Sequence, residues 1–324
     1  NSSHLSTNQS DFSSVFTQDV LPPLYFLIGL AGTVLNGAAA CIFFRVPSDS
    51  GLVVYLKNMV VADLLMVATF PFRLAARLGV GGWRLHVVMC RYTAVLFHSS
   101  MYVGILFMGF ISLERYVKIV RPAASHLLQT VAFARVLALL TWTFLLLCVL
   151  PNVLLTGAPG RQETWRPCVE LKTPLGVQWH RVSSLFSVGL FWATLLLLLF
   201  CYSSIACRVY RSYRRVRHSN SAACRRSNRS IASLLAVFAL CFVPYHVCRV
   251  PYTLSQMPAA NFSWSSRFLL YQIKEGTLFL SALNVCLDPV VYFLMCGTFR
   301  ESLLRKLPGP ERGRSLTTAQ SLSN

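Results

Sequence analysis

Charged residues are scarce in this sequence. Only 13% of its 324 residues are Asp, Glu, Lys or Arg, whereas 55% are hydrophobic and the mean hydropathy is +0.54. A soluble domain of this length needs far more charge to cover its surface. The apolar residues also form long blocks, and a block of about 18 or more can cross roughly 30 Å of hydrocarbon as a helix. The scarcity excludes a soluble protein and indicates an all-α membrane protein.

Acidic residues are scarcer still, with 11 Asp and Glu against 30 Lys and Arg and a formal net charge of +19. A positive excess of this size is typical of nucleic-acid-binding proteins. Here, however, the basic residues lie between the apolar blocks rather than on one soluble face, so no nucleic acid is expected as a partner. The sequence also lacks a nucleophile–base pair or a metal-ligand cluster, so we expect neither an enzyme nor a cofactor.

Seven apolar blocks are present, each long enough to cross a bilayer. Several exceed the roughly 20 residues that a crossing needs, so tilt or extension into water is expected. A membrane transporter is the alternative from another class, but transporters often show matched halves or broken helix pairs, and neither is visible. The sequence predicts a seven-transmembrane helix bundle with helices over residues of about 22–44, 53–78, 87–120, 131–155, 180–213, 228–256 and 268–294.

Basic residues predict the orientation of the bundle. With the N-terminus outside the cell, 19 of the 30 Lys and Arg residues fall on the inner side, where short loops are enriched in these residues. Asn1 and Asn8 each begin an Asn-x-Ser sequon, a glycosylation acceptor that is modified only outside. We therefore expect a multi-pass plasma-membrane protein with an extracellular N-terminus.

The chain is predicted to have three parts. Residues 1–20 form a glycosylated extracellular N-terminus, and residues 21–296 form the seven-transmembrane domain. In residues 297–324, apolar Phe299 and Leu303 alternate with Arg and Lys. This pattern favours a short amphipathic eighth helix on the inner membrane surface, where anionic lipids attract it. A disordered cytoplasmic tail is expected to follow, because the remainder is rich in Ser, Thr and Gln.

Four polar residues lie in the middle of apolar blocks, where an unsatisfied polar group is costly. One interpretation is a set of interhelical hydrogen bonds that serve stability alone. The other is a shared cluster that binds a sodium ion at Asp63 and rearranges during activation. The four residues are Asn36, Asp63, Asn284 and Asp288.

Short motifs occur in order along the chain, one set in most of the predicted helices. The motifs are Asn36 in the first helix, Ala62-Asp63 in the second, Glu114-Arg115-Tyr116 ending the third, Trp142 in the fourth, Phe242-Val243-Pro244 in the sixth and Asp288-Pro289-x-x-Tyr292 in the seventh. Together they resemble the rhodopsin-like, or class A, family of G-protein-coupled receptors over about residues 21–306.

The resemblance implies a switch at the inner end of the bundle. In the family, Arg115 is held by the neighbouring Glu114 at rest and is released to meet a heterotrimeric G protein, while Tyr202 and Tyr292 rearrange towards it. An Arg–carboxylate pair in a poorly hydrated setting can act as a two-state element. The alternative is that Arg115 only anchors its helix at the interface. The expected partners are a Gi-type G protein and an arrestin, and Tyr116 completes the switch motif.

The 11 cysteines lie mostly within apolar blocks, where they are small apolar residues. Cys90 and Cys168 are the two that fall clearly outside, in an oxidising compartment, and the family pairs these positions in a disulfide. The cysteines that relatives often pair between the N-terminus and the third outer loop are absent. A looser N-terminus is therefore expected.

The outer helix ends are rich in cations and poor in acids. A positively charged mouth attracts anions, and the planar fork of Arg suits phosphate or carboxylate. Any one of these residues could instead reach lipid headgroups. We expect a small anionic extracellular ligand, since the mouth carries Arg73, Arg77, Arg84, Arg91, Arg181, Arg249 and Lys274.

Several of these cations lie in longer motifs, which include Thr69-Phe70-Pro71-Phe72-Arg73, Trp179-His180, Pro244-Tyr245-His246-Val247-Cys248-Arg249-Val250-Pro251-Tyr252 and Lys274-Glu275-Gly276-Thr277-Leu278. These motifs resemble the purinergic branch of the family, which senses ADP or UDP-sugars, and within it most closely an orphan member. The resemblance implies that Arg73, Arg249 and Lys274 contact phosphate, that Tyr252 stacks on the ligand or bonds through its hydroxyl, and that Glu275 contacts a sugar. Tyr102, His180 and His246 are further expected pocket residues.

The residues expected to recognise the nucleotide base differ from those of the purinergic branch. His98 and Arg181, both expected in the pocket, stand where ADP-sensing members carry a Tyr and an acid, and Ser184 and Val188 replace amides. The sequence thus predicts a Gi-coupled receptor for a nucleotide or a nucleotide sugar. A phosphate-headed lipid, such as a lysophosphatidic acid, would satisfy the same cations and is the alternative.

Overall fold

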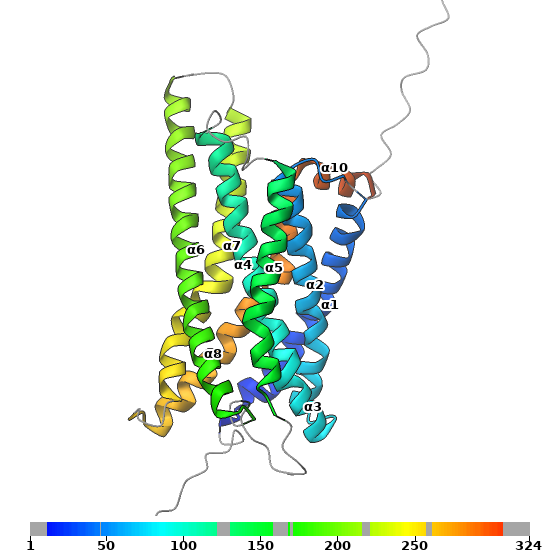
Figure 1. Ribbon diagram of the computed structural model, residues 1–324. Coiled ribbons are helices and arrows are strands. Elements are labelled where there is room, and N and C mark those ends of the chain that lie inside the picture. The colour runs from blue at the N-terminus through cyan, green and yellow to red at the C-terminus, as the bar shows by residue number, and fades with distance from the viewer. Residues whose placement is uncertain are drawn as a thin grey trace, which may run out of the picture.

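The computed structural model describes residues 12–45, 47–121, 130–157, 168, 171–215, 221–256 and 261–306, with backbone alone for 212–215, 221–228 and 306. Within these residues, seven helical spans are long and apolar enough to cross a membrane. They pack side by side in one elongated bundle (Figure 1). The described chain has no β-strand, only an isolated antiparallel bridge between Thr156 and Lys172. The predicted seven-transmembrane bundle is confirmed.

The seven spans are built from eleven helical elements. A short π-helix leads into the first span, three consecutive elements form the third, and two share the seventh. In order, the elements are η2 (Phe16–Val20), α1 (Leu21–Phe43), α2 (Gly51–Arg77), α3 (Gly82–Val88), η3 (Met89–Thr93), α4 (Ala94–Val120), α5 (Val131–Leu154), α6 (Pro174–Arg215), α7 (Ser221–Ser255), α8 (Trp264–Ala282) and α9 (Asn284–Met295), followed outside the spans by α10 (Gly297–Lys306).

Several helices begin earlier than hydropathy alone predicts, because polar caps fix their first turns. α6 begins at Pro174, where the Thr173 hydroxyl accepts a hydrogen bond from the Gly176 N–H at 3.1 Å. Proline is well tolerated in a first helical turn, since its missing N–H has no helical partner there. Ser263 caps α8 in the same way, through the Ser266 N–H at 3.2 Å. Polar first turns lower the local hydropathy, so both starts were predicted too late.

Pro289 explains how the first and seventh spans are joined. Proline has no N–H, so the carbonyl of Val285, four residues earlier, loses its helical partner. Asn36 of α1 donates its amide N–H to this carbonyl at 2.6 Å and to the Gly32 carbonyl at 3.0 Å. The mid-span asparagine therefore ties α1 to α9 through the backbone carbonyl that the proline leaves free.

Large apolar side chains cover the outside of the bundle. On α5, six leucines are each more than half exposed, namely Leu139, Leu140, Leu146, Leu147, Leu150 and Leu154. In water, an apolar face of this kind is prone to association. Against lipid tails, it is what a membrane-spanning helix requires.

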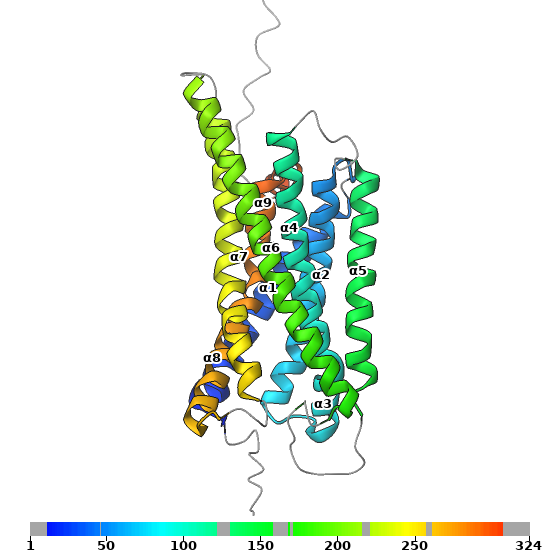
Figure 2. The ribbon, with the colours of Figure 1, turned by 60° about the vertical axis from the view of Figure 1, so that its left-hand side comes forward.

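The two ends of the bundle differ. We call the end that carries η2 and α3 the N-terminal end, and the end crossed by α10 the C-terminal end (Figures 1 and 2). The Phe299 ring of α10 stacks on Phe43 of α1, with ring centroids 4.9 Å apart. The helix predicted after residue 297 is thus present, and Phe299 holds it against the bundle.

The N-terminal segment, residues 12–20, is fixed to α8 without a covalent bond. The Phe12 ring lies 6.1, 6.4 and 5.8 Å from the ring centroids of Trp264, Phe268 and Tyr271. Gln272 donates to the Phe12 carbonyl at 2.7 Å and accepts from the Ser14 hydroxyl at 2.7 Å. The expectation of a looser N-terminus is wrong for this segment, because aromatic and amide contacts hold it against α8.

Candidate functional site

Two cavities lie between the helices at the N-terminal end of the bundle. The smaller, about 230 Å³, is lined by residues of η3 and α4 to α8. The larger, about 530 Å³, is lined by the N-terminal segment, α2, α3, η3, α4 and α8. The two cavities adjoin, because both are lined by Ala94, His98, Cys168 and Lys274.

Cations line the smaller cavity without acids. Arg249, Lys274 and Lys172 face it, and among its described lining residues none is Asp or Glu. The Arg249 guanidinium donates to the Ser184 hydroxyl at 3.1 Å and lies 5.9 Å from the ring centroid of Tyr245. The smaller cavity is therefore electrostatically suited to an anion.

Lys172 is a cavity residue that was not predicted from the sequence. Its ammonium donates to the Asn152 amide oxygen at 3.2 Å and to the Thr156 hydroxyl at 3.4 Å. Burial lowers the pKa of this ammonium below its ordinary value, because desolvation penalises the charged form. No motif marks Lys172, which is held at the cavity by its antiparallel bridge to Thr156 and by its hydrogen bonds to Asn152 and Thr156.

Two tyrosine–histidine pairs cross from α4 to α7 at this end. The Tyr102 hydroxyl lies 3.0 Å from His246 Nε2, and the Tyr245 hydroxyl lies 3.0 Å from His98 Nε2. Each imidazole Nδ1 faces the backbone carbonyl four residues earlier, at 2.8 Å for His246 and 2.7 Å for His98. This assigns the proton to Nδ1, so that Nε2 accepts from the tyrosine. His246 is fully buried and lines neither cavity, whereas His98 lines both.

Two consecutive residues of α6, His180 and Arg181, point in different directions at the site. His180 lines the smaller cavity, as Tyr102 and Tyr252 do. Arg181 is exposed and lines neither cavity. Because an α-helix turns by about 100° per residue, two consecutive side chains diverge and here only the first faces the cavity. The structure therefore contradicts the predicted place of Arg181 in the pocket.

Arg73 faces the larger cavity, apart from Arg249. Its guanidinium carbon lies 4.5 Å from the ring centroid of Phe97 and 5.5 Å from that of Tyr25. Only 9% of the residue is exposed, and its Nε has no hydrogen-bond partner. Of the three predicted phosphate contacts, Arg73 lines the larger cavity, Arg249 lines the smaller one, and Lys274 lines both.

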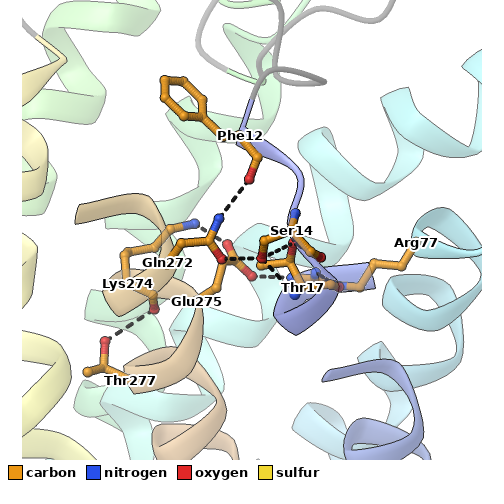
Figure 3. A network of polar contacts seen from close by, with 8 residues as sticks. All are labelled: Phe12, Ser14, Thr17, Arg77, Gln272, Lys274, Glu275 and Thr277. Atoms are coloured by element: carbon orange, nitrogen blue, oxygen red, sulfur yellow. Dashed lines mark hydrogen bonds and ion pairs between the residues drawn. The ribbon is translucent and has the colours of Figure 1, made fainter. Parts of the chain in front are cut away.

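Glu275 is the one acid among the described residues that line the larger cavity. Its carboxylate forms ion pairs with both Arg77 and Lys274 (Figure 3). Arg77 also donates to the Thr17 carbonyl at 2.9 Å. Arg77 was recognised as a basic residue of the mouth but not as a site residue. Its spacing of four from Arg73, which places both on one helix face, was the signal that could have shown it.

A polar cluster lies in the middle of the bundle. Asn284 donates to Asp63 at 3.5 Å and to Asp288 at 3.4 Å, and the Tyr292 hydroxyl donates to Asp63 at 2.5 Å. The buried Oδ1 atoms of Asn284 and Asp288 have no hydrogen-bond partner. Carboxylate and amide oxygens of this kind fit a hard cation such as sodium. Asn36, expected in the same cluster, instead bonds to the backbone of Val285.

The C-terminal end of α4 carries the predicted switch in a different pairing. Glu114 pairs with Lys118 at 2.5 Å rather than with Arg115, because the spacing of four residues places Glu114 and Lys118 on the same helix face. The Arg115 Nη1 and the Tyr202 hydroxyl are buried without hydrogen-bond partners. The expectation that Glu114 holds Arg115 is corrected accordingly. Tyr116 packs against an aromatic ring of α6.

The disulfide between Cys90 and Cys168 is confirmed, with Cα atoms 5.3 Å apart. It fixes the segment before α6 to η3, and both half-cystines line the smaller cavity. His86 Nε2 lies 3.6 Å from the Cys90 sulfur, but the three side chains do not form a metal site, because both sulfurs are consumed in the bond. The predicted glycosylation sites, Asn1 and Asn8, lie outside the described residues.

Comparison with known proteins agrees with this architecture. Residues 36–292 match the 7 transmembrane receptor (rhodopsin family). The chain is similar to purinoceptor 14 of Bos taurus, with 43% identity over 295 residues that cover 91% of this chain and 87% of the relative. It is 41% identical to G-protein coupled receptor 87 of Mus musculus over 313 residues, covering 97% and 87%. It is 37% identical to purinoceptor 13 of Homo sapiens over 309 residues, covering 95% and 85%. The chain therefore belongs to the rhodopsin family of G-protein-coupled receptors, in its purinoceptor branch, and is a membrane receptor rather than an enzyme.

Proposed function

We propose that this receptor binds a phosphate-bearing extracellular ligand, a nucleotide or a nucleotide sugar, and activates a Gi-type heterotrimeric G protein. The observation that carries the proposal is the smaller cavity, lined by Lys172, Arg249 and Lys274 with no acid among its described lining residues. Of the three, Lys274 has a described ion-pair partner, Glu275, outside this lining, so an anion placed beside Arg249 and Lys172 is favoured by their charge. The Arg249 fork suits phosphate oxygens in particular.

The aromatic lining supports the nucleotide over other phosphates. Tyr102, Tyr245 and Tyr252 face the same cavity as the cations, and aromatic rings provide surfaces on which a planar base can stack. Two of the similar proteins are purinoceptors by name. A phosphate between the cations and a base against the tyrosines would use both halves of the lining.

We propose that the N-terminal end of the bundle is extracellular, with Asn1 and Asn8 glycosylated. This agrees with the excess of Lys and Arg in the loops of the opposite end and with the position of both cavities. An epitope tag at the N-terminus should be stained on intact cells that express the receptor. Staining that requires permeabilised cells would contradict this orientation.

A ligand screen tests the proposed function directly. Cells expressing the receptor are treated with nucleoside diphosphates, UDP-sugars and lysophosphatidic acid, and inhibition of stimulated cAMP formation is measured. We expect a response to a nucleotide or nucleotide sugar and none in cells that lack the receptor. A response to the lysophospholipid alone would establish the alternative ligand class. Activation by an uncharged ligand alone, with a potency that Arg249→Ala leaves unchanged, would refute the phosphate site.

A further inference from the structure

Two of the cations at the cavities, Arg77 and Lys274, are already paired with an anion of the protein itself, the Glu275 carboxylate. The Glu275 carboxylate lies between Arg77 of α2 and Lys274 of its own helix and pairs with both (Figure 3). The residue is only 4% exposed. Water therefore compensates these charges poorly, and the carboxylate is needed as long as the two cations remain buried.

Lys274 is the member of this ion-paired group that a ligand in the smaller cavity can contact. It lines both cavities, and its ammonium lies 5.2 Å from the ring centroid of Tyr252 and 4.9 Å from that of Tyr271. The rings restrict the directions from which another group can approach the ammonium. An anion in the smaller cavity therefore competes with Glu275 for Lys274, instead of finding an uncompensated charge.

Arg77 determines how strongly Glu275 depends on Lys274. The Arg77 guanidinium donates to Glu275 and, at 2.9 Å, to the Thr17 carbonyl. Thr17 belongs to the N-terminal segment, in which the Ser14 hydroxyl is bonded to Gln272 of α8. Arg77 is thus held in place from a second element and remains beside Glu275 when Lys274 turns to a ligand.

We propose that Glu275 is a built-in counter-ion for Lys274 and that Arg77, by sharing the carboxylate, controls its replacement by ligand phosphate. This inference rests on the proposed function. When a phosphate takes Lys274, Glu275 stays paired with Arg77, so each cation keeps an anion. A ligand with one negative charge takes the place of the Glu275 carboxylate beside Lys274 and adds no further attraction. A ligand with at least two negative charges brings more negative charge to Lys274 than Glu275 did, so competition with Glu275 favours multiply charged phosphates.

The two residues predict opposite effects on affinity. Glu275→Gln removes the competitor, so anions bind Lys274 more tightly, by about tenfold for one charge-assisted contact. Arg77→Gln leaves Glu275 with Lys274 as its only partner, so anions bind about tenfold more weakly. In the Arg77→Gln/Glu275→Gln double variant the loss caused by Arg77→Gln should disappear, because Arg77 acts through Glu275.

The test uses the purified full-length receptor and two small probes, inorganic pyrophosphate and the monoanion dimethyl phosphate. Affinities are obtained from the rise of the melting temperature with probe concentration. The wild type should prefer pyrophosphate, and Glu275→Gln should reduce this preference by binding dimethyl phosphate more tightly. Arg91→Gln is the matched control, since Arg91 bonds to the Val153 carbonyl and lines neither cavity.

The outcomes separate this inference from the proposed function. If pyrophosphate stabilises none of the receptors, the phosphate ligand is refuted, and the counter-ion with it. If it stabilises the wild type but Glu275→Gln binds no more tightly, or if Arg77→Gln weakens binding equally in both backgrounds, the counter-ion alone is refuted. Should Glu275→Gln fail to fold, the double variant carries the test. The double variant removes one charge of each sign. If it binds pyrophosphate more tightly than the wild type, the proposal is supported, and if it binds pyrophosphate more weakly, the proposal is overturned.

Discussion

At the scale of single residues, Arg249 is expected to contribute most to binding of an anionic ligand. Its guanidinium faces the smaller cavity and has the Ser184 hydroxyl as its one assigned hydrogen-bond acceptor in the described structure. Since a charge-assisted hydrogen bond contributes about 1.5–3 kcal/mol, Arg249→Ala should lower agonist potency by roughly ten- to a hundredfold. Arg249→Lys should recover only part of the loss, because a point charge cannot replace the planar fork. Concentration–response curves at matched surface expression provide the measurement.

Arg181→Ala is the control for this prediction. Arg181 carries the same charge but is exposed and lines neither cavity, so its removal should change potency by no more than about threefold. Equal losses for Arg249→Ala and Arg181→Ala would mean that net charge, and not contact with the ligand, determines potency.

Asp63 provides a second prediction at this scale. It accepts hydrogen bonds from Tyr292 and Asn284, and the adjoining Oδ1 atoms of Asn284 and Asp288 have no partner. If sodium binds here, it stabilises the resting arrangement and lowers agonist affinity. Asp63→Asn retains the shape but removes the charge, so agonist binding should become insensitive to added sodium chloride, with potassium chloride as the ionic-strength control.

Asn36→Ala separates the sodium site from general damage to the bundle. Asn36 bonds to the Val285 carbonyl and not to Asp63, so this variant should lose stability yet keep its response to sodium. If Asp63→Asn only destabilises the receptor and sodium acts on it as on the wild type, the cluster serves structure alone.

At the scale of the element, the C-terminal turn of α4 contains a competition between two cations for one carboxylate. Glu114 is paired with Lys118, one helical turn away, and Arg115 is left without this partner. Arg115→Ala should abolish G-protein activation while preserving ligand binding. Lys118→Gln frees Glu114 to restrain Arg115, so basal activity should fall. Glu114→Gln removes any restraint, so basal activity should rise.

Basal and agonist-driven G-protein activation in membranes, with ligand binding measured in parallel, distinguishes these cases. The opposite signs of Lys118→Gln and Glu114→Gln are the decisive feature. Two variants that shift basal activity in the same direction would show that Glu114 acts by anchoring the helix rather than by restraining Arg115.

The Cys90–Cys168 disulfide joins η3 to the segment that precedes α6. Breaking it releases Cys168 from the cavity wall, so either Cys→Ser variant should lose ligand binding or surface expression. The double variant should be no worse than a single one, because all three break the same bond. Radioligand binding to surface-expressed receptor tests this, and normal binding by Cys90→Ser would exclude a required role.

The helices were predictable from the sequence, whereas their contacts were only partly so. Long apolar blocks identified all seven spans, since crossing hydrocarbon constrains composition over about 20 residues. The pairing of Glu114 depended on one helical turn and was assigned to the wrong neighbour. Lys172 and the docking of Phe12 depend on segments distant in sequence that meet only in the fold. The composition of the sequence does not indicate which distant segments will be in contact.

At the scale of the whole molecule, charge is distributed unevenly along the bundle. At the N-terminal end, the described residues include nine cations and two acids, Asp19 and Glu275. A field of this sign accelerates the approach of an anionic ligand, and salt weakens it, because the screening length falls from about 10 Å at 0.1 M salt to about 3 Å at 1 M. The cations are Arg73, Arg77, Arg84, Arg91, Lys172, Arg181, Arg249, Arg267 and Lys274.

This field predicts the role of Arg181, which touches neither cavity. A charge at the rim of a site changes the rate of association more than that of dissociation. Arg181→Glu should therefore slow association of a phosphate-bearing agonist several-fold at low salt, leave its dissociation rate nearly unchanged, and lose its effect at high salt. Binding kinetics measured at both ionic strengths provide the test. A faster dissociation that persists at high salt would instead mean that Arg181 contacts the bound ligand directly, and the exposed position found here would not describe the liganded receptor.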